Sequence, residues 1–402
     1  MKKFFVIFNI FLLSLAILAI TSCNAMYFSF RSAKFYTEKT TIKTFEQLDD
    51  PIVILATVGD DVSFMGIPGF FSRYKSYGDV FVVIDRETNS IFDWVFLPVR
   101  EEYSSTIWRA IEMGSNPTCY YSSSIDGRIG CLNPTKTEVT IYDTDVKKYY
   151  LEPCIIRGTK CILVDCFSNN KAVTFRFFDA ETGRFSDKKS EVDCDINIDQ
   201  PIEATDGTLW TVLECKKDGA SFECLYFIDI DKEELVGPYI SFPLRIQNGV
   251  MSNVLLCIKD SRAYFSISTP DNSENSIVVA KLDIESQNAS IEKEITFSAP
   301  CDTSDFFMSS AYFYNGRLYG TVCCFGEEDI WNWICEVDVE NGTSRILENS
   351  RMDIFATENT WFKGNRIYLM YGNDSYMYYD LEKQEKSGLY KIDYETMSIV
   401  AK

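Results

Sequence analysis

Short runs of hydrophobic residues separated by polar turns dominate this chain. They are rich in Val, Ile, Tyr, Phe and Trp, as in residues 80–85 ("VFVVID") and 225–229 ("LYFID"). Alternation of period two divides side chains between the two faces of an extended strand, and these residue types favour that conformation. No stretch after Cys23 shows helical periodicity over three turns. The pattern therefore predicts an all-β protein.

A strand that ends in Asp recurs along the chain, and the residues after each Asp are turn formers. An Asp in this place can accept hydrogen bonds from backbone amides two or three residues on, so each copy predicts a hairpin. A second turn precedes most copies. The Asp positions are Asp85, Asp143, Asp179, Asp229, Asp283, Asp338 and Asp393, and the second turns lie at Gly127, Gly158, Gly207, Ser261, Gly316 and Gly364.

This repeat predicts the architecture. The last four intervals between the Asp residues are 50, 54, 55 and 55 residues, and a fixed period of about 40 to 50 residues is typical of propellers and arrays. Each unit holds about four strands, which pack best radially. We predict a β-propeller over residues 52–402, with seven four-stranded blades fitting best and six or eight also open. The variable connections should then share one face of the disc.

The first residues predict an export signal. "MKK" precedes an apolar stretch from Phe4 to Ile20, and the ending Ile20-Thr21-Ser22-Cys23 resembles the lipobox of bacterial lipoproteins. That resemblance implies a signal peptide at 1–22 and a lipid on Cys23. Residues 23–51 would hold the lipidated Cys, a tether and a strand that could close the ring. An ordinary transmembrane anchor is the alternative, because 17 apolar residues are at the lower edge of spanning length.

Charge and composition exclude several functions. Fifty-nine acidic residues against 39 basic ones give a net charge of −20, which argues against nucleic acid as a partner. The absence of histidine excludes Ser-His-Asp, Cys-His and His-metal chemistry. We expect no metal and no cofactor. The expected address is the cell envelope, by lipid anchor, and Asn24 after Cys23 favours the outer membrane or cell surface over the inner membrane.

The repeats also carry a family resemblance. "LYFIDIDKEE", "WICEVDVENGTSRI" and "LYKIDYETMSIV" resemble the repeats of bacterial quinoprotein-like propellers, although only Trp94 lies near the place where such repeats carry a Trp. Members that use calcium and pyrroloquinoline quinone have a ligand cluster without a match here. Lipoprotein members imply a scaffold role in envelope assembly, which suits Cys23 better.

The variable connections hold the candidate binding residues. Aromatic residues with Arg are enriched at the centres of protein interfaces, and aromatic faces also stack on sugars. The alternative for each residue is packing between blades. The candidates are Phe70, Phe71, Arg73, Tyr74, Glu327, Glu328, Trp331, Trp333, Tyr376 and Tyr378.

Two functions follow from this architecture. The first is a binding scaffold that contacts an envelope protein or surface ligand through its variable loops. The second is an exported hydrolase or lyase that uses paired carboxylates on carbohydrate, for instance Glu327 with Glu328 or Asp60 with Asp61. Neighbours on a strand point to opposite faces, so such pairs suit catalysis poorly. No residue is assigned as catalytic.

The chain has 14 cysteines. Cys215 and Cys224 flank "KKDGASFE" at the ends of two expected antiparallel strands, so a hairpin disulfide could form. The alternative is that most cysteines are small buried hydrophobic residues. Without CxxC or histidine, a zinc site has little support.

Overall fold

The structure is a computed structural model, and a defined part of the chain is described. These residues are 27–28, 48, 51–64, 73–98, 106–109, 119–123, 128–133, 138–143, 151–157, 160–165, 173–179, 182, 184–192, 194–198, 202–217, 220–243, 246–247, 250–251, 253–268, 275–298, 306–325, 330–352, 360–371 and 374–401.

Every regular element among the described residues is a β-strand. They form seven sheets of at least four strands and one two-stranded sheet, and neighbouring strands pair antiparallel. The first three sheets contain β1 (Tyr27–Phe28), β2 (Ile52–Phe64), β3 (Arg73–Asp85) and β4 (Ser90–Pro98); β5 (Thr106–Arg109), β6 (Cys119–Ser123), β7 (Arg128–Asn133) and β8 (Glu138–Asp143); β9 (Leu151–Arg157), β10 (Lys160–Asp165), β11 (Val173–Asp179) and β12 (Arg184–Val192).

The fourth sheet interrupts its first strand, and the last sheet adds strands at its outer side. The fourth contains β13 (Cys194–Ile198), β14 (Ile202–Glu203), β15 (Leu209–Lys217), β16 (Ala220–Asp229) and β17 (Glu234–Pro243). The pair β18 (Ile246–Gln247) and β19 (Val250–Met251) follows. The fifth sheet has β20 (Asn253–Lys259), β21 (Arg262–Ser268), β22 (Asn275–Asp283) and β23 (Asn288–Phe297).

The sixth sheet has β24 (Phe306–Tyr314), β25 (Arg317–Phe325), β26 (Ile330–Asp338) and β27 (Thr343–Ile346). The seventh has β28 (Thr360–Lys363), β29 (Arg366–Tyr371), β30 (Ser375–Asp380), β31 (Glu385–Lys386), β32 (Tyr390–Asp393) and β33 (Ser398–Ala401). Both β31 and β32 pair with β30, and β33 adds a further strand outside β32.

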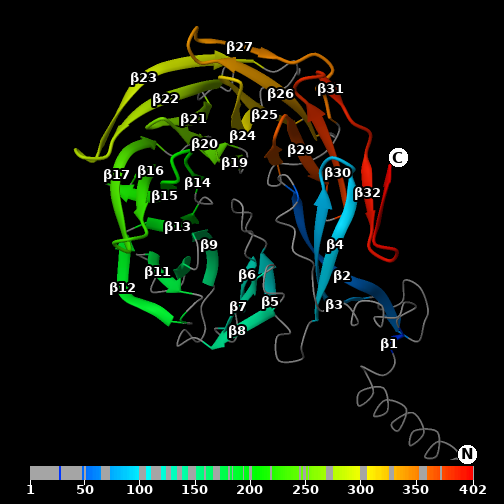
Figure 1. The fold of residues 1–402 in the computed structure, drawn as a ribbon. Coiled ribbons are helices and arrows are strands. Elements are labelled where there is room, and N and C mark those ends of the chain that lie inside the picture. The colour runs from blue at the N-terminus through cyan, green and yellow to red at the C-terminus, as the bar shows by residue number, and fades with distance from the viewer. Residues whose placement is uncertain are drawn as a thin grey trace, which may run out of the picture.

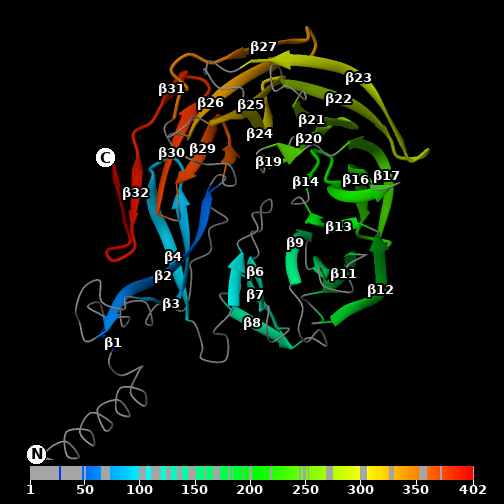
Figure 2. The same ribbon diagram turned by 180° about the vertical axis from the view of Figure 1, so that it is seen from behind.

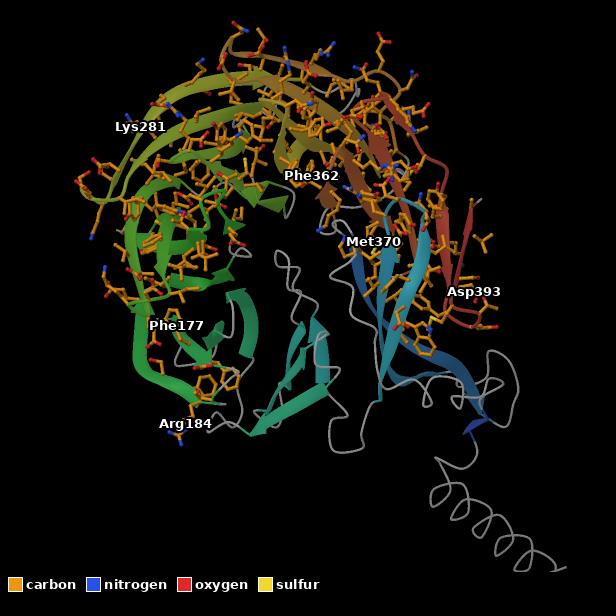
Figure 3. The ribbon with its side chains drawn as sticks, viewed as in Figure 1. Phe177, Arg184, Lys281, Phe362, Met370 and Asp393 are labelled. Carbon is orange, nitrogen blue, oxygen red and sulfur yellow. The ribbon has the colours of Figure 1, made fainter. Side chains whose placement is uncertain are left out.

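The sheets stand around a common centre, which makes the chain a β-propeller (Figures 1 and 2). In the sixth sheet the first strand, β24, lies toward the centre and the last, β27, toward the outside, whereas β1 of the first sheet lies at the periphery (Figure 1). Phe362 lies toward the inside of the ring, whereas Arg184, Lys281 and Asp393 lie at its periphery (Figure 3). The predicted all-β class and β-propeller fold are confirmed, and the blade number stays a prediction.

The Asp repeat builds the turn between the third and fourth strands. In six sheets this turn has four residues and follows an Asp, at 86–89, 180–183, 230–233, 284–287, 339–342 and 381–384. The Asp85 carboxylate accepts a hydrogen bond from the Glu87 backbone N–H at 2.9 Å. Four residues after the Asp, the backbone turns left-handed, with φ 50° at Asn89 and 68° at Gly342. The Asp of the repeat thus accepts the hydrogen bonds that the backbone amides of its turn donate.

Two copies of the predicted repeat lie elsewhere. Asp143 ends β8, the fourth strand of its sheet, and Asp393 ends β32 near the outer side of the last sheet. The equivalent turn of the last sheet follows Asp380, whose carboxylate accepts from the Glu382 and Lys383 amides at 3.0 Å each. "YYDLEKQ" was missed because the later "KIDYET" matches the repeat more fully.

Alternation along each strand lets one sheet serve two interfaces. On β25, Val322 belongs to the cluster shared with the fifth sheet, and Tyr319 belongs to the cluster shared with the seventh. Successive outer strands also touch, since β17 contacts β23 and β23 contacts β27. Burying both faces is what radial packing offers a sheet of this kind.

The ring closes where the last sheet packs against the first. We call the contact of Ile52, Ile54, Val80, Val82 and Ile84 with Tyr368, Met370, Tyr376 and Ile392 the closing interface. At its edge, the Arg366 guanidinium donates a hydrogen bond to the backbone carbonyl of Arg86 at 2.9 Å, and β33 contacts β4.

Strand exchange does not contribute to this closure within the described part of the chain. Residues 360–401 supply all described strands of the last sheet, and β1 pairs with β2 in the first. The run at 34–45, predicted as a strand that could close the ring, lies outside the described residues, so that role stays a prediction.

Candidate functional site

The two ends of the sheets differ in the regularity of their loops. At one end, which we call the turn end, lie the four-residue turns after the third strands. At the opposite end, the connection end, the links between the second and third strands vary in length. The shortest is 218–219 and the longest is 65–72. Four predicted binding residues fall within such links and lie outside the described residues: Phe70, Phe71, Glu327 and Glu328.

Arg73 and Tyr74 lie in a strand. They begin β3, where Arg73 is the register partner of Val62 and Tyr74 that of Asp61. This places both residues at the connection end of the first sheet, because the other end of β3 is the Asp85 turn.

Trp331 and Trp333 also lie in a strand. They occur two residues apart on β26, and both pack, half-buried, against the cluster shared by the fifth and sixth sheets. The Arg351 guanidinium lies 5.0 Å from the centre of the Trp331 ring, at the distance of a cation–π contact. Packing between sheets therefore accounts for much of both side chains, as the alternative interpretation of the sequence proposed.

Tyr376 and Tyr378 belong to a tyrosine cluster at the closing interface. Tyr376 is fully buried and stacks on Tyr390, with ring centres 5.2 Å apart and planes 18° apart. Tyr378 is half-buried and also stacks on Tyr390, with ring centres 6.0 Å apart. Tyr376 has no exposed surface to offer a partner, so the expectation that it lies on an exposed loop is wrong. The sequence pattern could not show this, because the alternation of side chains along a strand is the same whether its aromatic residues are buried or exposed.

Arg366 is the cationic residue of this cluster, and it was missed by sequence reasoning. Its guanidinium lies 4.7 Å from the Tyr378 ring centre and 3.6 Å from the Asp380 carboxylate. The signal was available, because an Arg directly follows the first turn in "SRAYF", "GRLYG" and "NRIYL". In the sixth sheet the equivalent Arg317 lies 3.2 Å from Asp338. Arg366 and Arg317 thus neutralise carboxylates that the adjacent strand brings close.

The carboxyl groups of the turn end serve the fold. The surroundings lower the pKa of five carboxyl groups: Asp85, Asp229, Asp283, Glu336 and Asp338. The hydrogen bond from the Asn341 side chain is the main cause at Asp338. At Glu336, burial raises the pKa, and hydrogen bonds from Arg345 and Tyr319 outweigh it. A carboxyl general acid needs a raised pKa, so none of these five suits that role.

The proposed hairpin disulfide is not formed. Cys215 and Cys224 are both thiols, and their register partners are Phe222 and Leu213, so the two cysteines are diagonal across β15 and β16. The Cys224 sulfur lies 3.2 Å from the Ser241 hydroxyl, and the Cys215 sulfur lies 3.6 Å from the Tyr226 hydroxyl. Two residues of stagger prevent the bond that the sequence spacing allowed.

The described residues contain neither a group of metal ligands nor a membrane-spanning helix. No group of three or more Cys, Asp or Glu side chains is placed to hold a metal ion in the part of the chain that the structure describes. No helix among those same residues combines the length and the apolar character needed to cross a membrane.

Comparison with known proteins yields structural similarity at low sequence identity. A protein from Lactobacillus plantarum is similar over 88% of this chain and 95% of its own, with 10% identity and a TM-score of 0.51. The β-propeller domain of the Trilobed protease from Pyrococcus furiosus covers 88% of this chain and 94% of its own, with 14% identity and a TM-score of 0.41. BamB from Moraxella catarrhalis covers 71% and 78%, with 10% identity and a TM-score of 0.41. No protein-family model and no curated protein sequence match the chain. At these identities the similarities concern the fold alone.

Proposed function

We propose that this protein is a lipid-anchored β-propeller of the cell envelope that binds a protein or surface ligand through the loops of its connection end. Cys23 carries the lipid, and the outer membrane or the cell surface is the membrane to which it is attached. The chain thereby acts as a scaffold that holds its partner near the envelope.

The difference between the two ends carries this proposal. The turns between third and fourth strands that follow an Asp all have four residues. The carboxylate of that Asp accepts hydrogen bonds from backbone amides of the turn, as at Asp85 and Asp380. The connection-end links vary in length, and the link at 65–72 carries Phe70 and Phe71 just before Arg73, the first residue of β3. Rigid frames with variable loops are the common arrangement of binding proteins.

Anchoring is tested by following the lipid. Cells that express the full chain are labelled with palmitate, with Cys23→Ala as the variant and Ser22→Ala as a control that keeps the cysteine. Labelling should be lost in Cys23→Ala and kept in Ser22→Ala. Unchanged labelling in Cys23→Ala would contradict the anchor.

Partner binding is tested by comparing the two ends. The pair Phe70→Ala with Phe71→Ala changes a connection-end link, and the matched pair Glu87→Ala with Glu285→Ala changes two exposed turn-end positions. After crosslinking in cells and recovery of the full chain, the first pair should lose the crosslinked partner and the second should keep it. Equal recovery by both, with unfolding midpoints unchanged, would contradict a binding surface at the connection end.

A further inference from the structure

The amino-terminal strand and the acidic turns lie at opposite ends of the first sheet. Tyr27 pairs with Phe64 and Phe28 pairs with Ser63, at the connection end of β2. The other end of β2 starts at Ile52, opposite Ile84, beside the Asp85 turn. β2 contains 13 residues, so its two ends are roughly 40 Å apart.

The distance from the anchor to β1 is short. Only Asn24, Ala25 and Met26 separate Cys23 from Tyr27. Four steps of fully extended chain span at most about 14 Å. A lipid on Cys23 therefore keeps β1 within about 14 Å of the membrane surface. Tyr, the first residue of β1, is also a residue type enriched at the membrane–water interface.

Negative charge recurs at the turn end, whereas the connection end of the first sheet also carries basic residues. An exposed acidic residue lies two positions after the Asp in each fully described turn after a third strand, at Glu87, Asp231, Glu285, Glu340 and Glu382. Carboxylates within a Debye length of an anionic bilayer, about 8 to 10 Å, are repelled by it. At the connection end of the first sheet, Asp60 is the register partner of Lys75, and Arg73 lies nearby on β3, so acidic and basic residues alternate there.

We propose that the protein sits on an anionic lipid bilayer with the β1 end of its first sheet at the membrane surface and its acidic turns directed away. This orientation rests on the lipidation of Cys23 in the proposed function. The covalent reach of the anchor fixes which end is near, and repulsion of the turns disfavours the reverse arrangement. The connection end of the first sheet then faces the bilayer side, so a partner bound beside it is a protein or ligand that lies at or in the membrane.

Lipid photocrosslinking in vesicles tests this orientation. Full-length lipoprotein is prepared with benzoylphenylalanine at Ser63, opposite Phe28, or at Ser290, which is exposed on β23 just after an acidic turn. Both are reconstituted into vesicles of phosphatidylethanolamine and phosphatidylglycerol and irradiated. Phospholipid should be attached several-fold more to the Ser63 variant. Equal attachment, or more at Ser290, would overturn the orientation.

Two controls separate this test from the test of the anchor. The mass of the N-terminal peptide shows whether Cys23 carries lipid in each preparation. Lipid on Cys23 with equal crosslinking overturns the orientation and leaves the anchor standing, whereas a peptide without lipid overturns both. If the Ser63 variant does not fold, Ser76 on the paired strand β3 supplies a second position at the same end, with the same expected result.

Discussion

The closing interface and the interface between the fifth and sixth sheets solve the same packing problem with different side chains. The latter buries aliphatic and sulfur-containing side chains such as Met308, Val322 and Cys335, and its buried rings include Phe297 and Phe306. The closing interface relies on Tyr368 and Tyr376, beside the Arg366 guanidinium. The fifth and sixth sheets are neighbours in sequence, whereas the closing interface joins residues nearly the whole chain apart.

This difference has a physical basis. Sheets that follow one another are held close by a short link, so the chain itself limits how far one can shift against the other. The first and last sheets share no strand among the described residues. Stacked rings and a charged hydrogen bond depend on direction, so they help to fix the register that the chain does not impose. Five predictions test this contrast, from the largest expected effect to the smallest.

Truncation of Tyr376 should have the largest effect. Tyr376→Ala removes a fully buried ring from the closing interface and should cost about 3–5 kcal/mol in the free energy of unfolding. Met308→Ala is the matched change between the fifth and sixth sheets and should cost about 2–5 kcal/mol. Urea unfolding measures both costs. Hydrogen exchange should accelerate in β4 and β29 for Tyr376→Ala only, and equal acceleration in β25 would remove the contrast.

Asp380 should matter more than its counterpart Asp283. Asp380 is buried at the closing interface and accepts two turn amides and the Asn365 side chain. Asp380→Ala leaves these donors unpaired and should cost about 1–3 kcal/mol. Asp283 forms the same turn in an exposed position, so Asp283→Ala should cost less. A larger loss for Asp283→Ala in thermal unfolding would show that burial is not the deciding factor.

Two glycines with positive φ provide a matched pair. Gly316 has φ 78° and open space where a Cβ would stand, whereas at Gly364, φ 58°, a Cβ would lie 2.0 Å from the Arg86 guanidinium. Gly316→Ala should cost about 1–2 kcal/mol for the left-handed backbone alone. Gly364→Ala should cost more, because Arg86 must also move. Chemical denaturation of both variants measures the difference, and identical values would mean that Arg86 shifts freely.

Alkaline pH should weaken the closing interface. Burial raises the pKa of Tyr368 to about 12, above the value of about 10 for an exposed tyrosine. The neutral ring therefore contributes stability that is complete below about pH 10 and is lost as the pH rises through about 12. Tyr368→Phe should make the unfolding midpoint fall less steeply from about pH 10 upward. Parallel curves for the two proteins would exclude Tyr368 as the titrating group.

Reduction should have the smallest effect. Because Cys215 and Cys224 are thiols, a reductant or the change Cys224→Ser should leave the unfolding midpoint nearly unchanged. A disulfide between them would instead contribute about 2–4 kcal/mol. Thiol counting in denaturant, with and without reductant, checks this, and a gain of two thiols on reduction of the wild type but not of the variant would contradict it.

Particular residues show how far the sequence could be interpreted. The turns after Asp229, Asp283 and Asp338 were predictable because each is a local hydrogen-bonding unit that needs only its own residues. The Asp380 turn was missed because two similar phrases compete near the C-terminus. Tyr376 and Tyr378 look alike in sequence and face the same interface, yet one is buried and the other half-buried, because exposure depends on the side chains that distant segments place around each ring.

Alternation of side chains and the spacing of turn residues by themselves determined the all-β class, the four-stranded units and the β-propeller. These features follow from interactions between residues close in sequence. Only the tertiary structure decided that Arg366 lies over Tyr378, that Trp331 and Trp333 pack between sheets, and that Cys215 and Cys224 are staggered. These facts depend on register and on contacts between distant segments, which a local pattern does not encode.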